Sequence, residues 1–402
     1  MSAPKKQNML IAQSGGPSMV INQSLVGAVI EAKKQAQIGK IFGSLHGIKG
    51  ILEEDLIDLR KESASSLEAV AATPSSGLGT VRQKPTAEDC TRIFEILRDH
   101  NVGYFFYIGG NDSCETVHII NQEAIKAKHP IHCFHIPKTI DNDLRSNDHT
   151  PGFGSAGRFV AQALQGVNLD NRALPGVHIS VIMGRHAGFL TAAAALGRVY
   201  EDDGPHLIYL PERPFSMPRF IKDVKAVYKK YGRCLIAVSE GIADSRGQAI
   251  AAKFSKEVDS HGNVQLSGTG ALGDLLANEI KARTTISRVR SDTFGYLQRS
   301  FMGCVSPVDA KEARAVGSVA VKTACQGVKS GSIAIKRKPG KAYKVNFVRV
   351  PLKAVARDAR EMPAKYINKA GNDVTQSFID YAAPIVGKLP KPGRLKGVKV
   401  KR

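Results

Sequence analysis

Short apolar runs alternate with helical patterns along most of the chain, and this alternation constrains the fold more than any other feature. Runs with the residue types of buried strands occur at 9–12, 103–108, 132–136, 178–183, 206–210 and 234–238. Apolar residues with helical spacing occur at 20–34, 87–100, 113–127, 187–197, 217–231 and 271–282. Repeated strand-then-helix order is typical of βαβ units around a parallel sheet. Because one sheet would not house this many strands, we expect an α/β protein with more than one sheet.

The net charge of +21 is concentrated near the C-terminus of the 402-residue chain. Residues 329–402 contain 19 Lys+Arg and 4 Asp+Glu, and residues 388–402 contain seven basic residues and no acidic one. Such a strip cannot bury apolar area, so we expect residues 1–387 to form the folded region and 388–402 a mobile tail. The tail has no aromatic side chain for stacking on bases, which argues against nucleic acid as the main partner.

Neither a membrane protein nor a secreted protein is indicated. No apolar run approaches the ~20 residues of a membrane-spanning helix, and the N-terminal residues lack the long apolar stretch of a secretory signal. The six cysteines are scattered without a CxxC pair, as expected of reduced thiols. The sequence therefore predicts a cytoplasmic protein without membrane association.

Two loops between an expected strand and an expected helix are rich in glycine. In QSGGPS (13–18), Gly15 and Gly16 let the backbone approach a ligand, and the following helix offers N–H groups to an anion. This loop matches no standard nucleotide motif, so a turn without a ligand remains an alternative. In IGGNDS (108–113), Asp112 lies shortly after two glycines, where its carboxylate could bind Mg²⁺. As the alternative, Asp112 or Ser113 could be the N-cap of the following helix.

The most specific segment is PKTIDNDL, residues 137–144. Asp141 and Asp143 are two residues apart, so an extended backbone would point both carboxylates to the same side. Like charges this close cost free energy unless they share a cation or a proton. Together with Lys138 they favour a metal bound to phosphate, or a general base, with a solvated turn as the alternative.

Two later segments add arginines, whose planar guanidinium groups suit phosphate oxygens. MGRHAG (183–188) places Arg185 where a strand meets a helix. FGYLQR (294–299) places Arg299 near Tyr296, and Arg290 lies just upstream. Surface ion pairing is the alternative for each arginine taken singly.

Taken in order, these segments resemble the phosphofructokinase family, and specifically its pyrophosphate-dependent members. The matching motifs are QSGGPS (13–18), IGGNDS (108–113), PKTIDNDL (137–144), TPGFGSA (150–156), MGRHAG (183–188), VSEG (238–241) and FGYLQR (294–299). The resemblance spans roughly residues 8–340. It implies two Rossmann-like parallel-sheet domains with the active site in the cleft between them. A donor-side lobe would contain about 1–138 plus part of 250–300, and a sugar-phosphate lobe about 139–250 plus later segments.

The resemblance also implies a role for each matching residue. Asp141 would take the proton from the sugar 1-hydroxyl, with Lys138 and Asp112 completing the catalytic set. The donor would be bound by Gly15, Gly16, Arg82 and Asn111. Fructose 6-phosphate would be bound by Thr139, Ile140, Asp141, Asp143, Met183, Gly184, Arg185, Glu240, Arg290, Tyr296, Leu297, Gln298 and Arg299. In that set, Arg290 would reach in from a neighbouring subunit of a homodimer or homotetramer.

Mg²⁺ is the cofactor that the resemblance implies, and Asp112 and Asn111 are its expected ligands. Asn111 stands where relatives have the usual metal-binding aspartate, so Asp143 remains an alternative ligand. A carboxylate is a stronger ligand for Mg²⁺ than an amide oxygen, which is why Asp112 is preferred.

Two positions bear on whether pyrophosphate or ATP is the donor. ATP-using relatives have glycine where this chain has Asp112, whose bulk and charge oppose a nucleotide α-phosphate. They commonly have glycine in place of Lys138, whose ammonium suits the charge of pyrophosphate. The resemblance therefore implies a reversible, Mg²⁺-dependent transfer from pyrophosphate to fructose 6-phosphate. The alternatives are an ATP-dependent phosphofructokinase, sedoheptulose 7-phosphate as a further substrate, and, remotely, a nucleic-acid-binding protein on a kinase-like fold.

Overall fold

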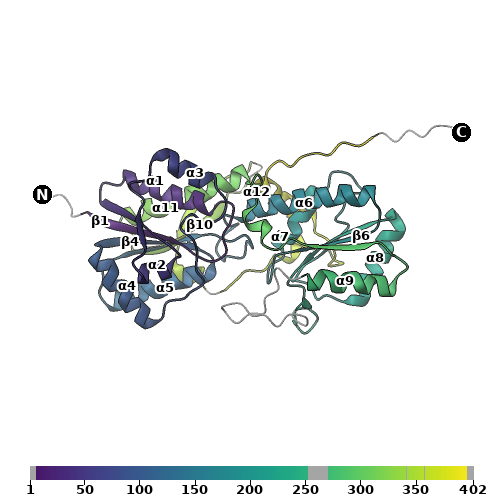
Figure 1. Ribbon diagram of the computed structural model, residues 1–402, viewed down its shortest axis with the longest axis horizontal. Helices are drawn as coiled ribbons and strands as arrows, with labels where there is room; N and C mark the ends of the chain where they lie inside the picture. Colours follow the sequence, from purple (N-terminus) through teal and green to yellow (C-terminus); the bar gives the residue numbers. More distant parts are fainter. Residues whose placement is uncertain (1–5, 252–269, 341, 357, 396–402) are drawn as a thin grey trace.

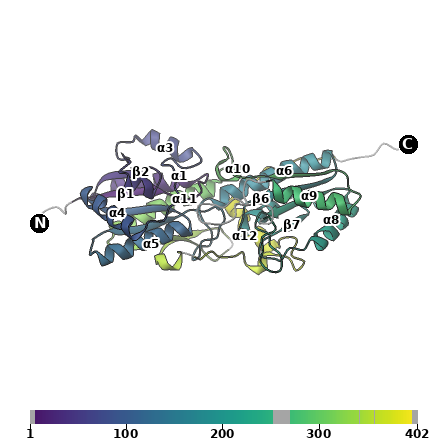
Figure 2. The same ribbon diagram turned by 60° about the horizontal axis from the view of Figure 1, so that its bottom comes forward.

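The computed structural model describes residues 6–251, 270–340, 342–356 and 358–395. Two lobes lie side by side along the long axis of the molecule, each built around its own sheet (Figures 1 and 2). The predicted α/β class with two parallel-sheet domains is confirmed. None of the described helices is long and apolar enough to cross a membrane.

The first lobe contains a seven-stranded sheet in the order β11-β10-β5-β4-β1-β2-β3. Its strands are β1 (Gln7–Gln13), β2 (Ile38–Ser44), β3 (Leu56–Asp58), β4 (Val102–Gly109), β5 (His132–Pro137), β10 (Ser330–Arg337) and β11 (Val345–Val350). The inner strands pair in parallel, whereas β3 and β11 are antiparallel to their neighbours. Both edges of an otherwise parallel sheet are therefore closed by antiparallel strands.

Helices cover both faces of this sheet because successive side chains of a strand point to opposite sides. Met9 and Ile11 belong to the core formed with α1 (Ile21–Lys34), α3 (Ala64–Ala72) and α11 (Pro307–Cys325). Leu10 and Ala12 belong to the core formed with α2 (Ile48–Leu52), α4 (Ala87–Asp99) and α5 (Asn111–Lys126). Two hydrophobic layers hold the strands in place, so their carboxyl ends present loops at one edge.

The second lobe contains a four-stranded parallel sheet in the order β7-β8-β6-β9. Its strands are β6 (Val177–Ile182), β7 (Leu207–Tyr209), β8 (Cys234–Ser239) and β9 (Val289–Thr293). One core includes residues of α6 (Phe153–Ala173), α7 (Phe189–Ala192), η1 (Ala193–Gly197) and α12 (Gln376–Val386). The core on the other face includes residues of α8 (Met217–Tyr231) and α9 (Ala271–Arg283). Short helices α10 (Leu297–Ser300), η3 (Leu352–Ala354) and η4 (Ala364–Tyr366) lie in the connections.

The division of the chain between the lobes differs from the prediction in one respect. Part of 250–300 was expected in the donor-side lobe, but α9 and β9 belong to the second lobe, where β9 pairs with β6. The first lobe is completed by α11, β10 and β11 instead, because β10 pairs with β5. The remainder of that expected segment, 252–269, lies outside the described residues.

The first part of the basic tail, residues 388–394, lies against the second lobe, whereas the sequence predicted a mobile tail. Arg394 bonds the carboxylates of Asp202 and Asp203 at 2.5 Å each. Three further side chains donate hydrogen bonds to tail carbonyls: Arg158 to Lys388, Gln165 to Pro390 and Tyr200 to Pro392. Ordering the tail costs conformational entropy, and the tail has little apolar area to offset that cost. The ion pairs with two aspartates and the three hydrogen bonds offset it instead. Residues 396–402 lie outside the described residues.

Candidate active site

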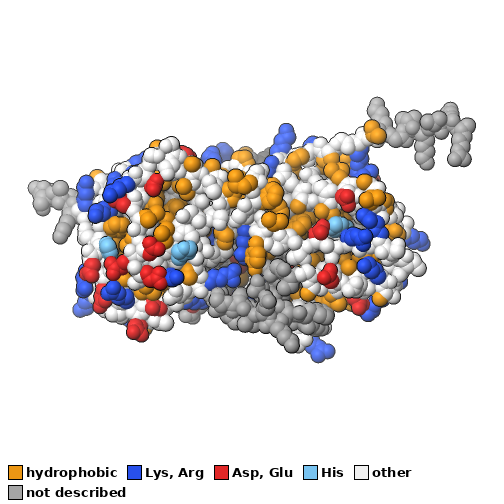
Figure 3. Space-filling model, in the orientation of Figure 1, with side chains coloured by type: hydrophobic (Ala, Val, Ile, Leu, Met, Phe, Trp, Pro, Cys, Tyr) orange, Lys and Arg blue, Asp and Glu red, His pale blue; other side chains and the backbone are white. Residues whose placement is uncertain are grey.

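A cleft of about 740 Å³ opens between the lobes, at the carboxyl ends of β1, β4, β5, β6 and β8. Ligands of parallel α/β sheets bind at this edge. Lys and Arg side chains are visible where the lobes meet (Figure 3). The predicted site residues that line the cleft are Gly15, Gly16, Arg82, Asn111, Asp112, Lys138, Thr139, Ile140, Asp141, Asp143, Met183, Arg185, Glu240, Tyr296 and Arg299. The structure thus brings together most of the residues that the motifs singled out.

Four predicted residues do not line the cleft. Gly184 has φ +146°, and a Cβ there would lie 2.7 Å from a backbone carbonyl oxygen, so it shapes the loop between its neighbours. Gln298 is buried and accepts a hydrogen bond from the backbone N–H of Met183 at 3.3 Å. The side chains of Leu297 and Arg290 are exposed on the second lobe. Gly184 and Gln298 therefore lie next to cleft-lining residues of the second lobe without lining the cleft themselves.

Lys138 lies at the floor of the cleft and is only 4% exposed. Its Nζ donates a hydrogen bond to the carbonyl oxygen of Gly16 at 2.5 Å. Burial lowers the pKa of Lys138 to about 7, and the positive charge of Arg299 lowers it as well. A bound phosphate would reverse this effect, because a nearby negative charge favours the ammonium form. Lys138 is therefore placed to become fully charged when an anion enters.

Asp141 and Asp143 both face the cleft from the aspartate loop, which we define as residues 138–148 after β5. Asn142 between them has φ +59°, a left-handed conformation, so the extended backbone expected for this segment is wrong. Burial raises the pKa of Asp141, and burial together with the charge of Asp141 raises the pKa of Asp143 to about 7. Such a pair retains a proton near neutral pH, and its ionised carboxylate is a suitable general base.

The positive side of the cleft is centred on Arg299 at the C-terminal end of α10. Its guanidinium lies over the ring of Tyr296, with 4.9 Å from Cζ to the ring centroid. A Cβ on Gly16 would lie 3.0 Å from the same guanidinium carbon, so the guanidinium packs closely against the glycine backbone. The opposing charges of Arg299, Lys138 and Arg185 lower the pKa of Asp141 and partly offset its burial. Positively charged side chains thus lie around the two carboxylates, and the space between these opposite charges suits a phosphate.

Asp112 lies in the first turn of α5, and its Oδ1 is 3.1 Å from Lys84 Nζ. The N-cap of α5 is Gly110, so the alternative that Asp112 or Ser113 is the cap is wrong. Among the described residues, no three His, Cys, Asp or Glu side chains converge as a closed metal site. Mg²⁺ usually takes one or two carboxylates plus phosphate oxygens. An exposed Asp112 in the cleft, beside the amide oxygen of Asn111, fits that pattern.

Several residues in the cleft were not predicted from the sequence. They are Ser14, Pro17, Val81, Gln83, Lys84, Tyr107, Gly110, Ser113, Thr116, His186 and Ala359. Ser14 and Ser113 lie inside the two glycine-rich motifs, and their hydroxyl oxygens are 2.5 Å apart. Their position within these motifs could have predicted that both serines line the cleft. Ala359 carried no signal, because it follows β11 and reaches the cleft only through tertiary folding.

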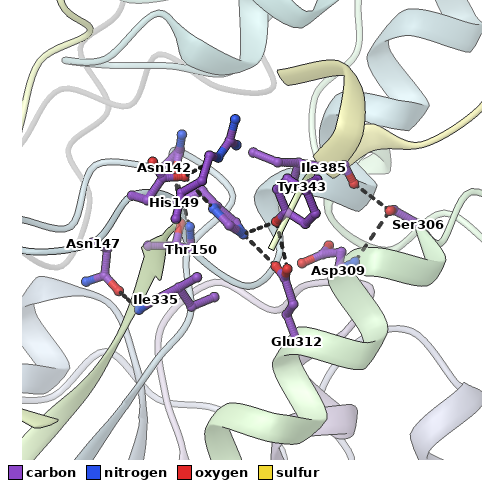
Figure 4. A network of polar contacts seen from close by, with 12 residues as sticks. Asn142, Asn147, His149, Thr150, Ser306, Asp309, Glu312, Ile335, Tyr343 and Ile385 are labelled. Carbon is purple, nitrogen blue, oxygen red and sulfur yellow. Dashed lines mark hydrogen bonds and ion pairs between the residues drawn. The ribbon is translucent and has the colours of Figure 1, made fainter. Parts of the chain in front are cut away.

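A buried polar network lies behind the aspartate loop and joins the two lobes (Figure 4). His149 Nδ1 is 2.9 Å from Asp148, and its Nε2 is 2.5 Å from Glu312 on α11. Tyr343 donates its hydroxyl hydrogen to the second oxygen of Glu312 at 2.7 Å. Burial alone would lower the pKa of His149, but hydrogen bonds to both carboxylates outweigh it and raise the pKa. The network therefore favours the imidazolium form of His149 and links Asp148 of the aspartate loop to Glu312 on α11.

A basic cleft that also holds two buried carboxylates offers the charge stabilisation and the base that transfer of a phosphoryl group requires. Residues 8–324 match the family model described as Phosphofructokinase. The chain belongs to the phosphofructokinase family, which confirms the resemblance seen in the motifs.

Several relatives of this chain bear the name pyrophosphate–fructose 6-phosphate 1-phosphotransferase. One from Rhodospirillum rubrum is 55% identical over 98% of this chain and 98% of its own length. One from Xanthomonas campestris is 37% identical over 95% of this chain and 92% of its own. A solved structure of a pyrophosphate-dependent phosphofructokinase from Marinobacter aquaeolei has a TM-score of 0.86 at 33% identity, covering 97% of this chain and 94% of that one. The likeness extends over nearly the whole chain in each case.

Proposed function

We propose that this protein transfers a phosphoryl group reversibly between pyrophosphate and fructose 6-phosphate, forming fructose 1,6-bisphosphate and phosphate. The observation that carries the proposal is the buried Lys138, which lies between the glycine-rich loop after β1 and the coupled carboxylates. The Rhodospirillum rubrum relative of 55% identity, whose name states this activity, supports it.

The donor side of the cleft favours pyrophosphate over ATP. Asp112 places a carboxylate at the start of α5, where it would repel the α-phosphate of a nucleotide. Pyrophosphate has no such third phosphate, and its charge would raise the pKa of Lys138 and keep the ammonium protonated. Gly15, Gly16 and Arg82 would complete the donor site.

The transfer step follows from the charges around the aspartate loop. Asp141 would take the proton of the sugar 1-hydroxyl while that oxygen forms its bond to phosphorus, and the bond to the leaving phosphate breaks. Lys138 and Arg299 would stabilise the charge on the transferring group, the main requirement of such a reaction. A carboxyl pair that titrates near neutral pH can both accept and return the proton, which suits a reaction that runs in both directions.

The sugar phosphate would lie against the second lobe. Thr139, Ile140 and Asp143 face it from the aspartate loop, and Arg185 and Glu240 from the loops after β6 and β8. The remaining proposed contacts are Met183, Tyr296 and Arg299. We propose that the exposed Arg290 on β9 completes this site in a neighbouring subunit of a homodimer or homotetramer.

Mg²⁺ is the proposed cofactor, with Asp112 and Asn111 as its protein ligands. When bound, it would neutralise negative charge on the donor phosphates and so assist attack by the sugar oxygen. Lys84 would then exchange its contact with Asp112 for its second partner, Glu115, whose carboxylate is 2.7 Å away. The pair formed with Lys84 therefore does not prevent Asp112 from binding a metal.

We also propose a cytoplasmic location. All six cysteines are free, and five of them are buried. Unpaired thiols are typical of proteins in reducing compartments.

A panel of donors and sugars tests the proposed function. The purified protein would be incubated with Mg²⁺, either pyrophosphate or ATP, and either fructose 6-phosphate or sedoheptulose 7-phosphate, and kcat/KM measured for each pair. We expect the highest value for pyrophosphate with fructose 6-phosphate. A preference for ATP would overturn the donor assignment, and a preference for sedoheptulose 7-phosphate would overturn the sugar assignment. Absence of transfer in every pair, with salt-sensitive nucleic-acid binding, would overturn both.

A further inference from the structure

The segment after β11 contacts the aspartate loop directly, although this segment lies beyond residues 8–324, which match the family model. The backbone N–H of Arg360 donates a hydrogen bond to the carbonyl oxygen of Asp143 at 2.7 Å. Next to it, Ala359 and Leu144 form an isolated antiparallel bridge. The two segments therefore run against each other directly at the second of the coupled carboxylates.

The guanidinium of Arg360 makes four hydrogen bonds, and every acceptor lies on the aspartate loop. Nε donates to the carbonyl oxygen of Asn142 at 2.9 Å, and one Nη2 bond reaches the Asn142 side-chain oxygen at 3.1 Å. Nη1 and Nη2 donate to the carbonyl oxygens of Asn147 and Asp148, each at 2.6 Å. Cζ of Arg360 lies over the ring of Phe189, 5.0 Å from the ring centroid. Four hydrogen bonds from a planar group with five N–H donors thus fix the orientation of the guanidinium on the aspartate loop.

Asn142 is the residue through which this contact reaches the carboxylates. It is fully buried and left-handed, a conformation that costs about 1 kcal/mol for a residue with a Cβ. Its side-chain amide donates to the hydroxyl of Tyr381 at 2.8 Å, and its side-chain oxygen accepts from the backbone N–H of Thr150 at 3.0 Å. Because Asn142 stands between Asp141 and Asp143, its dihedral angles decide where both carboxylates point.

We propose that Arg360 is a positioning residue for phosphoryl transfer. Its hydrogen bonds hold Asn142 in the left-handed conformation. The side chains of Asp141 and Asp143 are thereby kept oriented into the cleft. Arg360 itself is not among the residues that line the cleft, so it acts through the loop. The inference rests on the proposed function, because it assigns Asp141 as the base.

Substitution of Arg360 tests the proposal with a matched control. Arg145 and Asp358 form an exposed ion pair of 2.7 Å that joins the same two segments without contacting Asn142. In Arg360→Ala we expect kcat to fall by about 10–100-fold, since a misplacement of about 1 Å costs up to that much. KM for pyrophosphate should stay within about threefold, because its proposed contacts Gly15, Gly16 and Arg82 lie outside the aspartate loop. Arg360→Lys, which keeps the charge but not the fork, should have an intermediate kcat, and Arg145→Ala should match the wild type.

Thermal unfolding of each variant separates positioning from folding. A kcat for Arg360→Ala within about threefold of the wild type, or a loss no larger than its loss of folded protein, would overturn the proposal. An equal loss in Arg145→Ala would overturn it too. If Arg360→Ala does not fold, Arg360→Lys decides: reduced kcat at unchanged KM for pyrophosphate supports the proposal, and wild-type kcat refutes it. Wild-type protein without pyrophosphate-dependent transfer would instead refute the proposed function.

Discussion

Ionisation of Asp143 should destabilise the ligand-free protein, and Asp143→Asn should remove that penalty. Burial and the charge of Asp141 raise the pKa of Asp143 from an ordinary value of 3.8 to about 7. A carboxyl group whose pKa is raised by folding contributes stability that is present below its unfolded pKa and is lost as the pH rises through its folded pKa. The wild type should therefore lose stability relative to Asp143→Asn between about pH 4 and pH 7.

The size of the effect follows from the displaced pKa. A change from 3.8 to about 7 corresponds to at most about 4 kcal/mol, at about 1.4 kcal/mol per tenfold change in proton affinity. The side chain of Asp143 retains some contact with solvent, and we therefore expect about 2 kcal/mol. At pH 8 the variant should be more stable than the wild type by this amount, raising the thermal midpoint by about 2–4 °C. At pH 5 less than half of the gain should remain.

Thermal and urea unfolding without ligands, at pH 5 and pH 8, would measure the difference. Asp112→Asn is the matched control, because Asp112 is exposed and pairs with Lys84 at 3.1 Å. Its amide should give no stabilisation at pH 8. If Asp143→Asn is no more stable than the wild type at pH 8, or gains equally at both pH values, the raised pKa and the coupled-carboxylate interpretation are wrong.

Three further predictions concern catalysis and the tail. Asp141→Asn should lower kcat by ~10²–10⁴ because an amide cannot accept the proton, and turnover within about threefold of the wild type would show that Asp141 is not the base. The double variant Lys138→Gly with Asp112→Gly should shift the ratio of kcat/KM values from pyrophosphate toward ATP in a magnesium titration; an unchanged ratio would mean that these residues do not set donor choice. Truncation after Gly387 should lower the thermal midpoint, because it removes the two ion pairs of Arg394, and Arg394→Ala should reproduce part of the loss; an unchanged midpoint in both would show that the docked tail does not stabilise the second lobe.

Local patterns predicted the strands that form continuous apolar runs, including the edge strand β7, and missed strands interrupted by glycine or polar residues, including the inner strands β2 and β10. All six strands expected from apolar runs are present, among them β4 and β5, which are buried along their whole length. The edge strand β9 was missed because its sequence, VRSDT, alternates with polar side chains that face solvent. The long helix α6 was also missed, since its first turns contain glycines in place of a clear apolar stripe. A continuous apolar run is a local signature of a strand buried on both faces, whereas a strand interrupted by polar or glycine residues has no such signature.

The amino-acid sequence alone identifies the chemical groups at the strand ends: the glycines after β1 and β4, the lysine and two aspartates after β5, and the arginine after β6. Those groups are encoded within single loops of a few residues. The contacts of Arg360 with Asn142, of His149 with Glu312, and of Arg394 with the second lobe became visible only in the folded structure. These contacts join residues more than 150 positions apart, and local periodicity contains no information about such pairs. Burial likewise set the pKa of Lys138 and of Asp143, because removal of water is a property of the folded molecule.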